Sequence, residues 1–353
     1  MPSMTSASRA RWNELLAGIA GLLRAGPACV LVDGHGSQPG ILADRLADAL
    51  NACGRPCLRL PGVIADWNTA ESGNPCIPTT TIRLASGPGW CPGQRWDLMI
   101  WVRTAPGGHD GGVGNGAHGA NGSRREGEDA AAIVVDMHDP DWPVIRRVAA
   151  PLAAGGPWYL TETRAFFAVR AATWDAKFGD DLPAYAAAIA RAGVRHDGTV
   201  VDVGCGTGRA LPALRQAVGP RGTVIAVDVT PEMLLAARAA GRAAHAALVL
   251  ADARRLPLGD DSADAVFAAG LVSHLPDTEA GLGELARITR PGGLLVLFHP
   301  SGRAALAARH GRTLTPDEPL ASGPLRQSAR ATGWDLATYD DAADHFFALA
   351  VRR

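Results

Sequence analysis

One segment constrains the fold of this chain more than any other, because it predicts a strand, a glycine turn and a helix in direct succession. Residues 199–203 (TVVDV) form a short apolar run, as expected of a buried central strand. Three glycines follow at alternate positions, and residues 210–218 (ALPALRQAV) then have helical periodicity. Open parallel sheets bind ligands where such a turn joins a strand's carboxyl end to a helix. The segment therefore predicts an α/β fold with a ligand site at this turn.

The glycine spacing differs from that of a dinucleotide-binding fingerprint. A GxGxxG pattern would place its third glycine at position 209, which is Arg209 here. The pattern is DxGxGxG, and it resembles the first motif of class I S-adenosylmethionine (SAM)-dependent methyltransferases. The resemblance implies that this turn packs against the methionine part of SAM and that the acidic residue helps to hold it. The residues that it implicates are Asp202, Gly204, Cys205, Gly206 and Gly208.

The next two strands end in acidic residues to which the same resemblance gives roles. The second strand, TVIAVD, ends in Asp228, where a carboxylate can accept hydrogen bonds from both ribose hydroxyls. The third strand, AALVLAD, ends at Asp252, whose implied role is to accept a hydrogen bond from the adenine amine. The backbone N–H of Ala253 is implied to reach an adenine ring nitrogen. Further cofactor contacts are assigned to Val229 and Gly270.

The resemblance extends to the last residues of the sequence. Residues 263–269 (ADAVFAA) and 294–300 (LLVLFHP) are predicted as the fourth and fifth strands, and residues 331–353 supply a helix end and two more strands. The family pairs these last two strands as an antiparallel hairpin at the sheet edge. Residues 161–353 are therefore predicted to form a Rossmann-like class I methyltransferase domain with a seven-stranded sheet.

Two histidines follow strand ends at the edge where the family lines its active site. His274 lies in SHLPD after the fourth strand, and His299 lies at the end of the fifth. Either is a candidate general base for an acceptor that carries a proton on its reactive atom, with His274 ahead of His299. For His274 a structural or capping role is favoured over that of a base. Three aromatic residues before the first strand are candidates for a substrate lid or for the core: Trp174, Phe178 and Tyr185.

The first half of the chain has strand and helix patterns of its own. Buried-strand signals occur at 29–32, 98–102 and 131–137, and helical spacing of apolar residues occurs at 12–23 and 41–50. Strand–turn–helix units of this kind predict a second, smaller α/β domain with a parallel sheet.

Residues 29–50 (CVLVDGHGSQPGILADRLADAL) resemble the opening of uridine kinase-like P-loop proteins. A working P-loop needs GK[ST] before its helix, because the lysine reaches the phosphates and the hydroxyl holds magnesium. The chain has one lysine, Lys177, and Pro39 removes an N–H that would contact phosphate. The resemblance therefore implies a degenerate P-loop-like domain with a scaffold, dimerisation or substrate-presenting role. The positions aligned with the motif are Gln38, Pro39, Gly40 and Ile41; residual site candidates, which are also ordinary turn residues, are Asp33, Asp136, His138 and Asp139.

The domain boundary is expected near residue 160, after a segment at 139–156 that contains prolines and ends in glycines. This divides the chain into domains at 1–160 and 161–353. Eight of the sixteen residues 107–122 are glycine. Such a stretch has too few apolar side chains to form a core, so a disordered loop is expected at 105–128.

Composition limits the classes of function. A net charge of -1 without runs of like charge gives no electrostatic footprint for nucleic acid. No apolar run reaches the roughly 18 residues of a membrane helix. The six cysteines form no CxxC pair and no zinc-type spacing, which favours reduced thiols in the cytoplasm and predicts no metal site.

The leading hypothesis is a SAM-dependent methyltransferase that acts on a small-molecule acceptor in specialised metabolism. The segment between residues 301 and 325 is short, which favours a small substrate, and it holds no metal cluster. Two alternatives stay open. One is a non-catalytic SAM-binding scaffold or regulatory protein. The other is a bifunctional protein with residual nucleotide binding in the N-terminal domain, which is also the candidate surface for a homodimer.

Overall fold

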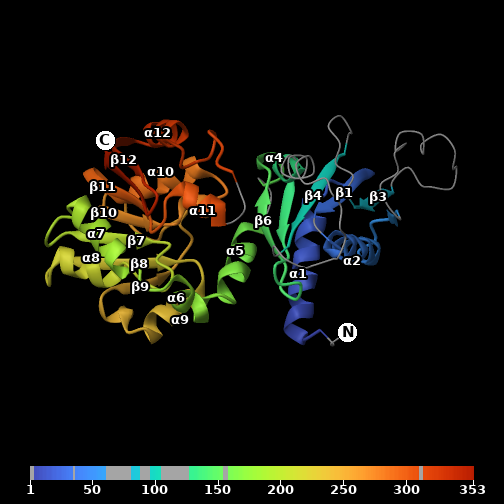
Figure 1. Ribbon diagram of the computed structural model, residues 1–353, viewed down its shortest axis with the longest axis horizontal. Helices are drawn as coiled ribbons and strands as arrows, with labels where there is room; N and C mark the ends of the chain where they lie inside the picture. The colour runs from blue at the N-terminus through green and yellow to red at the C-terminus, as the bar shows by residue number, and fades with distance from the viewer. Residues whose placement is uncertain are drawn as a thin grey trace. The chain divides into compact units, whose positions relative to one another are not determined.

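The computed structural model describes residues 4–34, 36–60, 81–87, 96–104, 127–153, 158–309 and 313–353. The chain divides into two compact units, which we call unit 1 (residues 1–162) and unit 2 (residues 163–353). Each unit has its own sheet (Figure 1).

Unit 1 is an open sheet of six strands in the order β2-β3-β1-β4-β5-β6, and its pairs are parallel except for β5 with β6. Its strands are β1 (Ala28–Gly34), β2 (Cys57–Arg59), β3 (Ile82–Ser86), β4 (Leu98–Arg103), β5 (Ile133–Asp136) and β6 (Val144–Val148). Its helices include α1 (Ser6–Leu22), α2 (Gln38–Ala52) and α4 (Ala150–Ala153).

The core of unit 1 follows from the spacing of its apolar residues. Trp12, Leu15 and Ile19 place one apolar face of α1 in the same buried cluster as the inner face of α2 and alternate residues of β1 and β4. The intervening strand residues, such as Leu31 and Trp101, point to the opposite face and form a second, smaller cluster. The sheet is thus apolar on both faces, as a parallel sheet requires.

The predicted strands at 29–32, 98–102 and 131–137 are confirmed as β1, β4 and β5. Strands β2, β3 and β6 were not predicted, and β6 lies inside the segment at 139–156 that we expected only to lead to the domain boundary. Pro143 stands just before this edge strand, where its missing N–H costs no ladder hydrogen bond.

Helix α2 begins at Gln38, three residues earlier than predicted, with a proline in its first turn. The positions aligned with the phosphate-binding lysine and hydroxyl therefore belong to the helix itself. The turn candidates serve as local backbone acceptors: Asp136 accepts from the His138 N–H at 2.9 Å, and Asp139 accepts from the Asp141 N–H at 3.0 Å.

Unit 2 has a three-layer α/β fold. Its seven-stranded sheet has the order β12-β13-β11-β10-β7-β8-β9. The strands are β7 (Thr199–Val203), β8 (Thr223–Asp228), β9 (Ala247–Leu250), β10 (Ala263–Ala269), β11 (Thr289–His299), β12 (Trp334–Asp341) and β13 (Phe346–Arg352). The helices are α6 (Trp174–Phe178), α7 (Leu182–Ala192), α8 (Leu211–Val218), α9 (Pro231–Ala239), α10 (Thr278–Ile288), α11 (Arg303–Arg309) and α12 (Ser322–Ala331), and α5 (Trp158–Ala168) crosses the division between the units.

The predicted Rossmann-like sheet of seven strands with an antiparallel edge hairpin is confirmed. Strands β7 to β11 run parallel, and β13 pairs antiparallel with both β11 and β12. Helices α10 and α12 pack on one face, and α7 and α8 on the other. β11 starts five residues earlier than predicted, so the predicted turn at 291–293 lies within this strand. Its pairing with β10 has a register shift at this point.

The glycine-rich loop prediction falls mostly outside the described residues. Its last two positions, Gly127 and Glu128, are described and are helical, and Glu128 accepts a hydrogen bond from Arg103 Nε at 2.7 Å. The ion pair with Arg103 on β4 thus holds Glu128, and the expected disorder of the loop stays a prediction.

A buried ion pair joins the beginning and end of unit 1. The guanidinium of Arg11 contacts the carboxylate of Glu162, and both side chains are almost fully buried. Arg11 Nε also donates to the Pro143 carbonyl at 2.8 Å, and Glu162 accepts from the Ile145 N–H at 2.5 Å. The pair thereby ties α1 to the start of β6.

Replacing Glu162 by Leu should destabilise unit 1 by about 3 kcal/mol, because Arg11 would keep its charge in a buried site without a partner. Hydrogen exchange of the α1 amides measures this loss. The matched control is Glu14→Leu, since Glu14 contacts the same guanidinium at 2.5 Å but is 54% exposed; it should cost less than about 1 kcal/mol. Equal protection in the two variants would contradict the role of the buried pair.

Candidate functional site

The glycine turn after β7 lies against the carboxyl end of β8. The N–H groups of Gly204 and Cys205 both donate to the Val227 carbonyl, at 2.8 and 3.0 Å. This fixes the turn against the neighbouring strand in the sheet, at the edge where parallel sheets bind ligands.

Three glycines make this path possible, because Gly204, Gly206 and Gly208 have φ values of 74°, 53° and 79°. They differ in what surrounds them. A Cβ at Gly204 or Gly208 would meet a leucine side chain at 3.1 or 2.8 Å, whereas a Cβ at Gly206 would have no atom within 4 Å. Gly206 therefore presents bare backbone to open space, as a surface for close approach by a ligand requires.

The carboxylate of Asp228 holds this turn in place through hydrogen bonds. One carboxylate oxygen accepts the Gly206 N–H at 2.8 Å, and the other accepts the Thr230 N–H at 2.8 Å. Burial raises the pKa of Asp228, while these backbone hydrogen bonds oppose the rise. The side chain thus couples the glycine turn to the start of α9, a structural task that the sequence did not reveal.

Asp202, at the end of β7, has an unsatisfied oxygen. Its Oδ2 is buried and accepts no hydrogen bond among the described residues. Burial, followed by the nearby charge of Asp228, raises the pKa of Asp202 to about 8. A buried carboxyl with a free oxygen costs free energy unless a donor or a cation completes it. The site therefore fits a ligand that carries positive charge.

Arg209 holds the far end of the turn, at the position where a dinucleotide fingerprint would have glycine. Its buried guanidinium donates from Nε to Asp181 at 2.6 Å and from Nη1 to Asp175 at 3.1 Å. Asp175 also accepts the Thr207 hydroxyl at 2.6 Å and an Arg242 hydrogen bond at 2.6 Å. Sequence reasoning missed this network, because each of its contacts joins residues more than 25 positions apart along the chain.

Asp252 has a partner already. Arg254 contacts both oxygens of its carboxylate, with Nη2 at 2.7 Å from Oδ2, and the Arg254 N–H donates to Oδ1 at 2.9 Å. The implied contact with the adenine amine stays a prediction, and it requires Arg254 to share this carboxylate. Ala253 is buried beside it.

The segment before β7 reaches the same edge of the sheet. Arg164 on α5 donates from Nε to the Val229 carbonyl at 2.9 Å. On the same helix, the Phe167 ring packs edge-on against the ring of His274, with centroids 5.1 Å apart. His274 lies in the 3-10 turn η4 (Val272–His274) that follows β10 and Gly270.

His299 ends β11, and its ring lies close to Gly270: a Cβ added there would be 3.9 Å from the ring carbon Cδ2. Its Nδ1 is 3.0 Å from the Ser301 carbonyl, which can only accept, so Nδ1 carries the proton and Nε2 keeps its lone pair. Burial lowers the pKa of His299, which favours the neutral form. The ring is thus in the tautomer that a general base needs.

The three aromatic residues named as lid or core candidates separate in the structure. Tyr185 packs on Phe298 in the core, with ring centroids 5.1 Å apart, and burial raises the pKa of its hydroxyl. Trp174 lies beside Phe167, with centroids 5.6 Å apart. The side chain of Phe178 lies outside the described residues.

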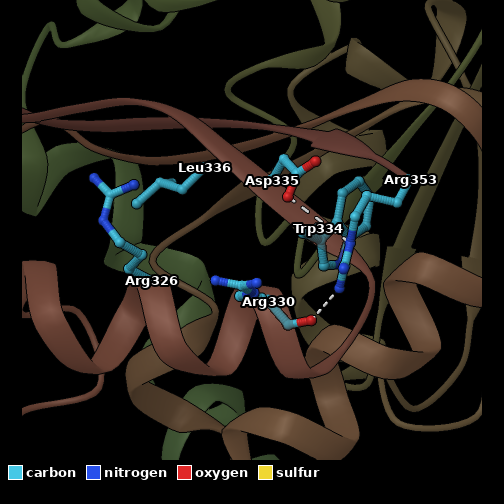
Figure 2. Close-up of a pocket in the computed structure, with 6 residues that line it drawn as sticks. All are labelled: Arg326, Arg330, Trp334, Asp335, Leu336 and Arg353. Atoms are coloured by element: carbon cyan, nitrogen blue, oxygen red, sulfur yellow. Dashed lines mark hydrogen bonds and ion pairs between the residues drawn. The ribbon is translucent and has the colours of Figure 1, made fainter.

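A surface groove of about 370 Å³ lies at the end of the unit 2 sheet that is opposite the glycine turn (Figure 2). Trp334 pairs with Arg352 at the start of β12, level with the beginning of β7 and not with its carboxyl end. The groove is therefore separate from the glycine turn. Its lining residues are Arg326, Arg330, Trp334, Asp335, Leu336 and Arg353.

The described residues hold neither a metal-ligand cluster nor a membrane-spanning helix. They contain no group of three or more histidine, cysteine or acidic side chains placed to hold a metal ion. Within the same residues, no helix combines the length and apolarity needed to cross a membrane.

Comparison with known proteins identifies the domain type around the turn. Residues 201–297 match the family described as a methyltransferase domain. The match begins in β7 and ends in β11, so it contains the glycine turn and the strand ends described above.

Both named enzymes and uncharacterised proteins are similar to part of this chain. A demethylmenaquinone methyltransferase of Staphylococcus aureus is 36% identical over 110 residues, which are 31% of this chain and 46% of that protein. An uncharacterised protein of Mycobacterium tuberculosis is 36% identical over 146 residues, 40% of this chain and 51% of its own. The chain thus spans about half or less of the curated relatives it matches. A solved SAM-dependent methyltransferase of Aquifex aeolicus aligns with a TM-score of 0.42 and 22% identity, covering 50% of this chain and 96% of that one.

S-adenosyl-L-methionine is the cofactor that the domain match assigns to unit 2. The residues present fit it. Gly206 offers bare backbone for close approach, and the free oxygen of Asp202 suits a cofactor that carries an ammonium and a sulfonium. The detailed assignment of Val229, Asp252, Ala253 and Gly270 to cofactor atoms stays a prediction.

Replacing Gly206 by Ala should weaken binding of S-adenosylhomocysteine (SAH), the demethylated cofactor, at least tenfold, because the new methyl group would occupy the open face of the turn. Isothermal titration calorimetry measures it. Gly241→Ala is the matched control: Gly241 also has a positive φ, 75°, with no atom near its missing Cβ, but it lies after α9. Both variants should lose similar stability from backbone strain, about 1 kcal/mol. Equal SAH affinities would contradict the assignment.

Proposed function

We propose that unit 2 is a SAM-dependent methyltransferase that acts on a small-molecule acceptor. The observation that carries this proposal is the glycine turn itself. It is held against β8 by Asp228, open at Gly206, and placed beside a buried carboxyl oxygen without a partner. The match of residues 201–297 to the methyltransferase domain family supports it.

The chain's own residues define the task of each part of the site. The turn holds the amino-acid end of the cofactor against its backbone, with Asp202 accepting from the ammonium. Asp228 uses one lone pair on each oxygen for the turn and for α9, so lone pairs remain for the ribose hydroxyls. When bound, SAM supplies a methyl group activated on a sulfonium. The protein then contributes chiefly by placing the acceptor in line with that group.

His299 is the better candidate for the general base. Its Nδ1–H is fixed by the Ser301 carbonyl and its Nε2 is unprotonated, so it can take a proton from an oxygen or nitrogen acceptor. His274 packs among aromatic rings on α5, which favours a part in binding the acceptor. This reverses the order in which the two residues stood from the sequence.

We infer the size of the acceptor from the short segment between β11 and α12. This stretch contains the seven-residue helix α11, and Arg303 at its start pairs with Glu318 at 3.0 Å and with Asp341. Those ion pairs fold the segment back on unit 2. Such a short cover suits a small molecule, and a role in specialised metabolism is part of the same proposal.

A non-catalytic SAM-binding scaffold or regulatory protein is the second candidate. The same turn and the same carboxylates would serve it, so binding alone does not separate the two. Turnover does, because a scaffold forms no SAH.

For unit 1 we propose a degenerate P-loop-like scaffold, with dimerisation or substrate presentation as its role. Its support is the place of Gln38 and Pro39 in the first turn of α2, where the motif of a working P-loop would supply lysine and N–H donors. ATP and GTP should show no binding by calorimetry to the full chain. Binding of either nucleotide at micromolar concentration would favour the bifunctional alternative.

Binding of SAH should tighten as the pH rises from 6 towards 8. Because the pKa of Asp202 is raised to about 8, its carboxyl is mostly protonated at pH 7, and a cationic ligand must displace that proton. Calorimetry in buffers of different ionisation enthalpy should therefore detect proton release at pH 7 that fades above pH 8. Asp202→Asn should abolish the pH dependence. Asp252→Asn should retain it, since Arg254 already pairs with that carboxylate. A pH-independent affinity in the unaltered protein would refute the role of Asp202.

The proposed activity predicts SAH formation from SAM with members of a panel of small phenols, amines and thiols. His299→Gln should lower kcat at least 100-fold while SAH affinity stays within twofold, because removing a base affects the reaction and not cofactor binding. Since burial lowers the pKa of His299, the acidic limb of kcat/KM should lie below pH 6.5 and disappear in the variant. His274→Gln is the comparison and should mainly raise the KM of the acceptor. Bound SAH without turnover on any acceptor would favour the scaffold.

A further inference from the structure

We infer that Gly302 and Arg309 are positioning residues for His299, because they hold the Ser301 carbonyl where it accepts the Nδ1 proton of the histidine. The inference rests on the proposed function, in which His299 is the general base. It identifies the part of unit 2 that keeps this base in the tautomer that the reaction needs.

The imidazole of His299 depends on a single acceptor. Its Nδ1 lies 3.0 Å from the carbonyl oxygen of Ser301, two residues further along the chain. A neutral imidazole carries its proton on either ring nitrogen, and the hydrogen bond made by one nitrogen decides which. Without the Ser301 carbonyl, the proton would be free to move to Nε2, which would then have no lone pair for a proton of the acceptor. The position of this carbonyl group therefore determines whether His299 is able to act as a base.

Gly302 fixes the peptide group that contains this carbonyl. It lies so close to the turn between β12 and β13 that a Cβ there would overlap the Ala342 carbonyl oxygen and lie 2.8 Å from the Ala342 carbonyl carbon. Among the described glycines, none has a closer neighbour at its missing Cβ. Gly302 is not one of the glycines with a positive φ. The position thus requires glycine because of space, and any side chain would push the segment away from the hairpin.

The same hairpin holds the residues on either side of this segment. After Gly302, the Arg303 N–H donates to the Asp341 carboxylate at the end of β12 at 2.9 Å, and Arg303 Nη1 donates to the same carboxylate at 3.3 Å. Before it, His299 on β11 pairs with Phe346 on β13. The edge hairpin therefore fixes both the strand that carries the histidine and the carbonyl that its ring needs.

Arg309 holds Ser301 from the far end of α11. Its Nη2 donates to the Ser301 hydroxyl oxygen at 3.2 Å, and Ser301 is buried whereas Arg309 is exposed. Helix α11 begins directly after Gly302, whose carbonyl accepts from the Leu306 N–H at 2.9 Å. The two polar groups of Ser301 thus have separate tasks: the hydroxyl anchors the residue to α11, and the carbonyl accepts from His299.

The charge of Arg309 also favours the unprotonated ring. Burial is the main cause of the lowered pKa of His299, and the Arg309 guanidinium lowers this pKa further. The Ser301 carbonyl and the Asp181 carboxylate act in the opposite direction, because both favour the imidazolium form. Arg309 therefore supports the base in two ways, through the Ser301 hydroxyl and through its charge.

The first test measures the tautomer directly, in the full chain at pH 8. With labelled histidine, ¹⁵N NMR distinguishes protonated from unprotonated ring nitrogens, and His299→Gln identifies the signals of His299. In the unaltered protein the form protonated on Nδ1 should predominate at least about tenfold, and Gly302→Ala should reduce this ratio at least about fivefold. Gly323→Ala is the matched control, because this glycine of α12 has no atom within 4 Å of its missing Cβ and no positive φ. It should leave the ratio unchanged.

The Arg309 variants keep the inference testable if Gly302→Ala does not fold. Arg309→Met should reduce the same ratio about threefold, and Arg309→Lys, which keeps a donor and the charge, should restore most of it. In a Ser301→Ala background Arg309→Met should have no further effect, because the hydroxyl through which it acts is gone. Additive effects of these two substitutions, or no rescue by lysine, would contradict the role of Arg309.

Turnover connects the tautomer to the reaction. Gly302→Ala should lower kcat at least about tenfold while SAH affinity stays within about twofold, and it should have no further effect in His299→Gln, because a positioning residue acts only through its partner. The inference is overturned if neither Gly302→Ala nor Arg309→Met changes the His299 signals. It is also overturned if Gly302→Ala lowers kcat equally with and without the His299 side chain. The expected NMR changes in a protein without turnover on any acceptor would instead count against the proposed function.

Discussion

The site of unit 2 depends on one interaction, the pair of backbone hydrogen bonds that Asp228 accepts. With one oxygen on Gly206 and the other on Thr230, a single carboxylate determines where the glycine turn lies and where α9 begins. Its position at the end of β8 makes this possible, because β7 and β8 are parallel neighbours and their carboxyl ends meet at one edge. The cost is a buried negative charge close to Asp202, whose pKa is raised first by its own burial and then by this charge.

That cost has a functional consequence. Two carboxyl groups near each other in a buried site are unfavourable without a cation, and the free oxygen of Asp202 marks where the missing charge would lie. The positive charges of the described turn are used elsewhere: Arg209 is occupied by Asp175, Asp181 and the Gly179 carbonyl. The turn is thus held by hydrogen bonds at Arg209, whereas Asp202 beside it keeps one oxygen without a hydrogen-bond partner. This arrangement suits a site that recognises its cofactor by charge as well as shape.

The segment between residues 163 and 181 supports the glycine turn from outside the sheet. Through Asp175 and Asp181 it braces the glycine turn, and its Phe167 and Trp174 rings pack against each other. Because these contacts come from one short segment, a change in its position would also move the glycine turn.

The sequence by itself determined the parts that depend on local order. The DxGxGxG spacing, the apolar runs and the acidic strand ends predicted β7, β8 and β10 with their bounds, the parallel sheet and its edge hairpin, since strand periodicity and glycine conformations are properties of neighbouring residues. Short edge strands such as β2 and β6 escaped prediction, because three to five residues carry too little periodicity. Only the tertiary structure decided two further points: that Arg209 braces the turn through Asp181, and that Asp228 holds the turn through the Gly206 N–H. Each of these is a contact between residues distant along the chain, and no local pattern encodes such a contact.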